Sequence, residues 1–185
     1  LTLNEYAAGR ARVVVGGGGE ALQALGIKPA RRVRAVGECV QILKGVTPGT
    51  PYSFAGQIHR VQDYNPFWAK APKPPIYVAV NKPQMLRMAA RVGDGIMLSD
   101  LTPLICRERI GWVRDHLREF GRPAEPFRCY NFVAWHVYAD RQRAIREAKM
   151  WLGYRGLFRR WVLNTFMTDA DYDVIEAHKA GIYGM

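Results

Sequence analysis

A run of four glycines, residues 16 to 19, follows three valines and is followed at once by a carboxylate, Glu20. Glycine has no side chain, so it accepts positive φ angles and lets another group approach the backbone closely. The run, which begins with Gly16, Gly17 and Gly18, therefore predicts either a flexible turn or a loop that leaves room for a flat ligand. Glu20 could exchange a proton with a bound substrate, or it could only stabilise the start of a short helix through the helix dipole.

The glycine run matches neither of two common phosphate-binding motifs. Ala21 stands where a dinucleotide fingerprint that begins at Gly16 needs its third glycine. No Gly-Lys-Ser or Gly-Lys-Thr follows, as a P-loop would require. Glu20 would also repel a phosphate, so the sequence predicts that an anion binds elsewhere.

The better candidate for an anion site is the phrase VNKPQ. A strand is expected to end at Val80 and Asn81, and Lys82 adds a positive charge. Pro83 suits the first position of a helix, whose free N–H groups would point outward toward an anion. The alternative is a solvated lysine in an ordinary loop that starts a helix.

Polar residues also follow the next expected strand. Ser99, Asp100 and Thr102 should rim the same pocket, because parallel strands present their C-terminal ends at one edge of a sheet. Asp100 could instead cap the helix that follows. Among the histidines, His136 alone sits in an expected strand that could reach this pocket.

No metal site is predicted. Cys39, Cys106 and Cys129 are far apart and form no CxxC pair, and no histidine stands at metal-ligand spacing. An odd number of scattered cysteines favours a reduced chain over a disulfide scaffold.

The hydrophobic pattern supplies the elements that would position these residues. Short β-branched runs predict buried strands, apolar residues at three- and four-residue steps predict helices, and alternation around Gly56 predicts a hairpin. The expected strands are residues 12–15, 76–80, 95–99 and 127–138, the hairpin is 52–61, and the helices are 20–25, 31–44, 83–92 and 104–120. Asp140 is expected to cap a helical tail that Gly153 and Gly156 divide, with a last helix around residues 171–178.

Strands that alternate with helices imply an α/β fold in which right-handed crossovers join parallel strands. A complete eight-stranded barrel takes about 250 residues. The 185 residues of this chain therefore correspond to about half of a barrel, or to a small open sheet, and we expect a single domain over residues 1–185. The sequence has no initiator methionine and opens in what reads as the last turns of a helix ended by Gly9, which suggests a fragment.

The formal charge of +11 and the pI near 9.9 favour an anionic partner, such as nucleic acid, an acidic membrane surface or a phosphorylated small molecule. Clusters such as Arg31, Arg32 and Arg34 suggest a basic nucleic-acid-binding module, whereas the buried-strand rhythm and the lack of a nucleic-acid motif argue against it. No apolar run approaches the roughly 20 residues of a membrane span and no signal peptide is recognisable, so the sequence predicts a soluble, cytoplasmic protein.

The order of the motifs resembles that of the luciferase-like monooxygenase superfamily. The similarity rests on GRARVVVGGGGEALQALGI, the hairpin YSFAGQIHRV, and PPIYVAVNKPQMLRMAARVGDGIMLSD followed by LTP. It is closest to the reductases and dehydrogenases that use the deazaflavin coenzyme F420, such as the methylenetetrahydromethanopterin reductases. The resemblance implies a (β/α)8 TIM barrel, of which this chain would supply approximately strands four to seven and a small β-hairpin insertion, truncated at both ends.

The resemblance also implies roles for individual residues. In the family, the loop that matches residues 80–82 lies against the cofactor ring and phosphate, although small residues are more usual there than Asn81 and Lys82. The cofactor-binding residues implied are Gly16, Gly17, Gly18, Val80, Asn81, Lys82 and Ser99. Glu20 is the implied catalytic acid, because Glu20-Ala21-Leu22 resembles a loop of deazaflavin sugar-phosphate dehydrogenases whose glutamate is proposed to act in that way.

The sequence therefore predicts an oxidoreductase that transfers hydride between coenzyme F420 and an organic substrate, with the cofactor carrying the chemistry. The nearest alternative is an FMN-dependent luciferase-like monooxygenase, and the alternative of another class is the nucleic-acid-binding module. We expect a small-molecule substrate, neither nucleic acid nor membrane as a partner, and a homodimer as an open option. The high positive charge could suit the anionic tail of the cofactor, and the isolated fragment could lack activity.

Overall fold

The computed structural model describes residues 1–18, 22, 25–27, 30–154 and 167–183, so the expected helix over residues 20–25 lies largely outside it. The chain forms two compact units, Leu1–Phe132 and Val133–Met185. Within the described residues, the first unit holds every strand and the second unit is helical.

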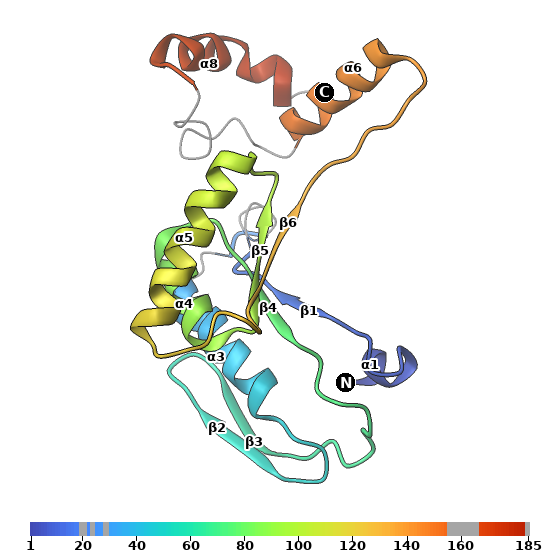
Figure 1. Ribbon diagram of the computed structural model, residues 1–185, viewed down its shortest axis with the longest axis vertical. Coiled ribbons are helices and arrows are strands. Elements are labelled where there is room, and N and C mark those ends of the chain that lie inside the picture. Colours follow the sequence, from blue (N-terminus) through green and yellow to red (C-terminus); the bar gives the residue numbers. More distant parts are fainter. Residues whose placement is uncertain (19–21, 23–24, 28–29, 155–166, 184–185) are drawn as a thin grey trace. The chain divides into compact units, whose positions relative to one another are not determined.

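Four parallel strands form the main sheet of the described part of the chain, in the order β1-β4-β5-β6 (Figure 1). These strands are β1 (Val13–Val15), β4 (Ile76–Ala79), β5 (Gly95–Ser99) and β6 (Arg128–Phe132). The register pairs Val15 with Val78 and Ala79 with Met97. This arrangement confirms the predicted α/β class with parallel strands.

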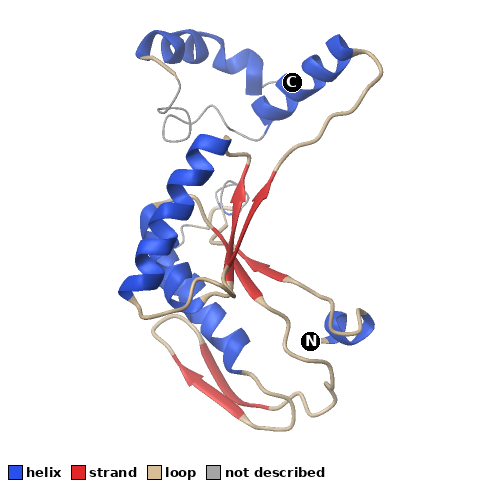
Figure 2. Cartoon of the chain, in the orientation of Figure 1, coloured by secondary structure: helices blue, strands red, loops and turns tan. Residues whose placement is uncertain are grey.

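Helices cover one face of this sheet (Figure 2). They are α3 (Arg32–Gly45), α4 (Pro83–Val92) and α5 (Pro103–Glu119). Val78 and Ile96 are fully buried on the face that the helices cover, whereas Tyr130 is 43% and Phe132 50% exposed on the opposite face. Helices on one face of a parallel sheet, with a second face left apolar, match a segment of a (β/α)8 barrel, in which the second face lines the interior.

Proline and glycine set the bounds of the elements nearest the site. Pro83 occupies the first turn of α4, and Gly93 follows its last residue. β5 begins at Gly95. A larger residue does not fit at this position, because a β-carbon would collide with the carbonyl of Arg128 and crowd the ring of Tyr77. The predicted ranges 83–92 and 95–99 are confirmed at both ends.

A separate antiparallel hairpin confirms the prediction for residues 52–61 and extends it to Tyr64. It consists of β2 (Tyr52–Ala55) and β3 (Arg60–Tyr64). Its turn is held by the buried Glu38 of α3, whose carboxylate accepts the three successive backbone N–H groups of residues 57–59, each at 2.9 Å. These hydrogen bonds hold the pKa of Glu38 below its ordinary value, and the bond from the His59 N–H has the largest effect. Burial of the carboxylate opposes the shift.

The expected strand over residues 127–138 is wrong in its second half. β6 ends at Phe132, which pairs with Ser99, the last residue of β5. Asp100 then adopts a left-handed backbone conformation with a φ of 53°, so β5 offers no further edge for pairing. Residues 133–138 belong to the second unit and form no strand.

The second unit contains α6 (Arg141–Tyr154) and α8 (Asp169–Tyr183). Asp140 caps α6 as predicted, because its Oδ1 accepts the backbone N–H two residues on at 2.8 Å. α6 continues through Gly153, which therefore does not divide it, and Gly156 lies outside the described residues. His136 is not in a strand, and its ring lies 6.3 Å from that of Trp151. None of the helices in the described ranges is long and apolar enough to span a membrane.

Candidate functional site

Three loops lie at the C-terminal edge of the sheet, because the strands before them are parallel. They are residues 16–18 after β1, residues 80–82 after β4, and residues 99–100 at the end of β5. A β-carbon added to Gly16 would lie 3.4 Å from the Cβ atom of Ala79, so the first two loops begin in contact. The structure therefore brings all the predicted cofactor-binding residues to one edge of the sheet.

The glycine loop packs against two helices of its own chain. A β-carbon at Gly17 would lie 2.6 Å from Cδ of Arg32 and 3.4 Å from Cε of Met85. Gly18 has a φ of +64°, and a β-carbon there would collide with the side chain of Leu22. A side chain at position 17 would have to displace the side chain of Arg32, and one at position 18 would meet Leu22 and would also carry the strain of a left-handed backbone.

The loop after β4 presents an unsatisfied acceptor. Val80 is buried, and its N–H donates to the carbonyl of Met97 at 3.0 Å. The Oδ1 atom of Asn81 is buried without a hydrogen-bond partner. A buried polar atom in this state costs about 1–3 kcal/mol, and a donor from a ligand would remove that cost. Lys82 is the N-cap residue of α4, whose first turn has no side-chain cap.

The loop after β5 is held firmly in place. Ser99 Oγ lies 3.1 Å from a carboxylate oxygen of Asp100. Asn131 of β6 clamps Leu101, because its Nδ2 donates to the Leu101 carbonyl at 2.9 Å while its Oδ1 accepts the Leu101 N–H at 3.4 Å. Thr102, rather than Asp100, caps α5. These hydrogen bonds hold the backbone that places Ser99 and Asp100 at the C-terminal edge of the sheet.

The arrangement fits a flat ring that carries a phosphate chain. Asn81 Oδ1 could accept the imide N–H of a flavin or deazaflavin ring, which needs an acceptor of this kind. The uncapped N-terminus of α4 is partly positive and suits a phosphate, to which Lys82 adds a full charge. Among the described residues, no group of three or more histidine, cysteine or acidic side chains is placed to hold a metal ion.

The predicted catalytic acid, Glu20, lies outside the described residues, so its role stays a prediction. Two histidines have partners of their own: His116 Nδ1 lies 3.1 Å from Glu119, and His178 Nδ1 lies 2.8 Å from the Val174 carbonyl. The three cysteines are free, and burial raises the pKa of each thiol.

Sequence reasoning missed the structural partners of the site. The sequence indicated Arg32 only as part of a charged cluster, whereas Arg32 and Met85 both lie against the position of a β-carbon at Gly17. Asn131 was not singled out at all. These residues lie far along the chain from the loops that they contact, so no local sequence pattern predicts the contacts. The polar Asn131 in a largely apolar segment was the one indication of a structural role.

Parallel strands, helices on one face and loops gathered at the C-terminal edge define part of a (β/α)8 barrel. The chain belongs to the luciferase-like monooxygenase family, whose model matches residues 1–184. The predicted resemblance is thereby confirmed and extends over the helical tail.

The chain is also similar to individual known proteins. The chain is 28% identical over 156 residues to a 5,10-methylenetetrahydromethanopterin reductase of Archaeoglobus fulgidus, an alignment that covers 80% of this chain and 45% of that protein. The fold matches an F420-dependent secondary alcohol dehydrogenase in complex with an F420-acetone adduct with a TM-score of 0.74 and 21% identity, over 83% of this chain and 48% of that one.

A coenzyme F420-dependent tetrahydromethanopterin reductase from Methanopyrus kandleri matches with a TM-score of 0.73 and 19% identity. That match covers 99% of this chain and 58% of the other. The chain thus spans about half the length of the proteins that it matches.

Proposed function

We propose that the full-length protein is an oxidoreductase that transfers hydride between coenzyme F420 and a small organic substrate. The observation that carries the proposal is the edge formed by residues 16–18 and 80–82, where an unpartnered acceptor and an uncapped helix start lie on neighbouring loops. Membership of the family and similarity to reductases and dehydrogenases that use F420 support the choice of cofactor.

In this proposal the residues of the chain bind and orient, and the bound deazaflavin supplies the hydride chemistry. Asn81 Oδ1 would accept the N–H of the ring. Lys82 and the first turn of α4 hold the phosphate, while Ser99 borders the pocket from the neighbouring loop. Glu20 moves a proton to or from the substrate. We also propose that the enzyme is cytoplasmic, and a homodimer is the oligomeric state to be tested.

The second candidate function is that of an FMN-dependent monooxygenase, because the chain belongs to a family of luciferase-like monooxygenases. Both cofactors have a ring with an imide N–H and a phosphate, so the features of the edge suit either one. The nucleic-acid-binding module has weaker support, since the described residues form a barrel segment. Random duplex at physiological salt should bind more weakly than the roughly 10⁻⁴ to 10⁻⁶ M that is usual for non-specific DNA-binding proteins.

Equilibrium titration of the full-length protein, followed by fluorescence quenching, tests the proposal. We expect a lower Kd for F420 than for FMN. A lower Kd for FMN would transfer the protein to the monooxygenase class, and binding of neither cofactor would remove the enzymatic function. Micromolar binding to duplex that weakens steeply with salt would instead favour the nucleic-acid module.

A further inference from the structure

The side chain of Asn131, in β6, pairs with the backbone of a residue outside its own strand. Its Nδ2 donates to the Leu101 carbonyl at 2.9 Å, and its Oδ1 accepts the Leu101 N–H at 3.4 Å. The amide thus mimics a peptide group and satisfies both backbone groups of Leu101, which is buried. Asparagine is depleted in strands, so its presence in β6 indicates a role other than strand formation.

A third hydrogen bond from β6 holds the residue before Leu101. The N–H of Asp100 donates to the carbonyl of Phe132 at 2.7 Å, and Asp100 has the left-handed φ of 53°. This conformation is unfavourable for a residue with a side chain, although aspartate tolerates it better than most. Such residues persist where the surrounding contacts hold them, and they cluster at functional sites. β6 therefore holds the chain after β5 in a conformation that it would not readily adopt by itself.

The left-handed turn at Asp100 determines what surrounds Ser99, the last residue of β5. The Ser99 hydroxyl donates to a carboxylate oxygen of Asp100 at 3.1 Å. Ser99 lies on the same face of the sheet as Met97, because residues two apart in a strand point the same way. The Met97 carbonyl accepts the N–H of Val80 at 3.0 Å, which connects β5 to the loop before α4. Ser99 is thus fixed by its strand on one side and by the turn at Asp100 on the other.

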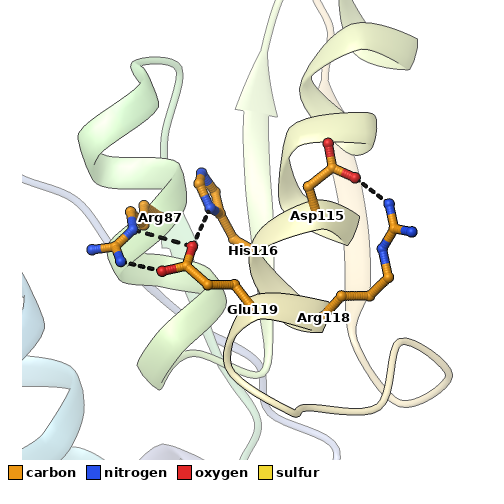
Figure 3. Close-up of polar contacts among 5 residues, drawn as sticks. All are labelled: Arg87, Asp115, His116, Arg118 and Glu119. Carbon is orange, nitrogen blue, oxygen red and sulfur yellow. Dashed lines mark hydrogen bonds and ion pairs between the residues drawn. The ribbon is translucent and has the colours of Figure 1, made fainter.

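The alternative is that the hydrogen bonds from β6 only fix the position of α5, but α5 has contacts of its own at both ends. Thr102 caps its first turn. At its last turn, Figure 3 shows Glu119 between Arg87 of α4 and His116, with a polar contact to each of them. The hydrogen bonds from β6 therefore chiefly determine the conformation of the turn between β5 and α5.

We infer that Asn131 is a positioning residue for the candidate site. Through its hydrogen bonds to Leu101 it holds the turn at Asp100, and this turn fixes the backbone and the hydroxyl of Ser99 at the C-terminal edge of the sheet. Asn131 acts through Ser99 rather than by contact with a ligand, because its neighbour Phe132 points to the opposite face. The inference rests on the proposed function, in which Ser99 borders the cofactor.

A double-variant cycle in the full-length protein tests this role, with the Kd for F420 measured by fluorescence quenching. Asn131→Leu and Ser99→Ala should each weaken binding by about 2- to 12-fold, the effect of one hydrogen bond. If Asn131 acts through Ser99, the variant with both substitutions should bind no more weakly than the weaker of the two single variants. An effect of Asn131 that is independent of Ser99 would instead add to the loss in Ser99→Ala.

Asn4 provides a matched control at the opposite edge of the sheet. Its Nδ2 donates to the Pro72 carbonyl at 2.6 Å and its Oδ1 accepts the Ala11 N–H at 3.2 Å, so it makes the same two kinds of hydrogen bond between the segments that precede β1 and β4. Asn4→Leu should lower the melting temperature, as Asn131→Leu does, and leave the Kd for F420 unchanged. If Asn131→Leu does not fold, Asn131→Asp, which keeps the acceptor for the Leu101 N–H, replaces it in the cycle.

The inference would be overturned by an unchanged Kd in a folded Asn131 variant or in Ser99→Ala. Losses that add in the double variant, or an equal loss of affinity in Asn4→Leu, would overturn it as well. Each of these results leaves the proposed function intact as long as the unaltered protein binds F420. Failure of the unaltered protein to bind F420 would overturn the proposed function, and this inference with it.

Discussion

The ammonium group of Lys44 lies 2.5 Å from Oδ1 of Asp94, and this ion pair joins the last turn of α3 to the loop before β5. The other carboxylate oxygen of Asp94 accepts the backbone N–H of Ile76 at 2.9 Å. Asp94 thus links a helix to the first residue of β4, at the opposite end of the strands from the site. The aspartate of the phrase AARVGDGIMLS therefore connects elements of the barrel segment.

Replacing Asp94 with alanine should therefore lower stability and leave cofactor affinity almost unchanged. The variant loses a hydrogen bond to a charged acceptor and a half-exposed ion pair, which together amount to about 1–3 kcal/mol. Thermal and denaturant melting measure the loss, and F420 titration measures the affinity. Glu125→Ala, which removes an exposed carboxylate, is the matched control. A large loss of affinity in a folded Asp94→Ala protein would contradict the structural assignment.

Glu38 should make stability depend on pH in the acid range. Folding lowers its pKa from the ordinary 4.5, chiefly through the His59 N–H, so its contribution is present above pH 4.5 and is lost as the pH falls toward the lower folded value. Glu38→Gln removes the titration but keeps the size of the side chain. We expect a lower melting temperature near neutral pH and a shallower decline on acidification. Parallel pH profiles for both proteins would refute the assignment.

The elements around the site could be predicted where the signal is local. Pro83 and Gly93 mark the ends of α4 in the sequence itself, and both bounds were correct. The end of β6 depends on its partner strand, since Phe132 is the last residue that β5 can pair, and the sequence beyond it keeps an apolar character. The apolar pattern therefore predicted a strand that continues beyond the true end of β6.

The candidate site likewise has features that the sequence predicts and features that depend on the folded structure. Parallel strands necessarily gather Gly16, Asn81 and Ser99 at one edge, and this much follows from the fold class. The detailed contacts do not follow, because Gly17 is constrained by Arg32, which comes from another element. The unpaired oxygen of Asn81 is likewise a property of the folded surroundings.

Gly18 and Gly26 form a matched pair for the glycine loop. Their φ angles are +64° and +69°, but a β-carbon at Gly18 collides with Leu22, whereas one at Gly26 meets nothing within 4 Å. Alanine at either position carries the left-handed strain of about 1–2 kcal/mol. Gly18→Ala should lose more stability, together with cofactor affinity, and the difference between the two melting curves isolates the contact. Equal effects would mean that only the backbone angle matters.

Asn81 offers a test in which stability and binding change in opposite directions. Leucine has a similar shape and removes the buried oxygen that lacks a partner, so Asn81→Leu should leave stability unchanged or raise it. If that oxygen accepts the ring N–H, the loss of one hydrogen bond should weaken F420 binding by about 2- to 12-fold. Melting and titration of the same sample check both effects. A variant that binds F420 normally would show that Asn81 does not face the ring.

Glu20 carries the chemical part of the proposal, and its replacement with glutamine tests it directly. Glutamine keeps the shape and the capacity for hydrogen bonds but cannot donate or accept a proton as an acid. A catalytic Glu20 should therefore lower kcat by about 10²–10⁴-fold, the usual contribution of a general acid or base, while Kd for the cofactor barely changes. If the carboxylate only interacts with the start of a short helix, the loss is about 0.3–1 kcal/mol of stability. A kcat within a few-fold of the unaltered protein, with a slightly lower melting temperature, would leave Glu20 that structural role alone.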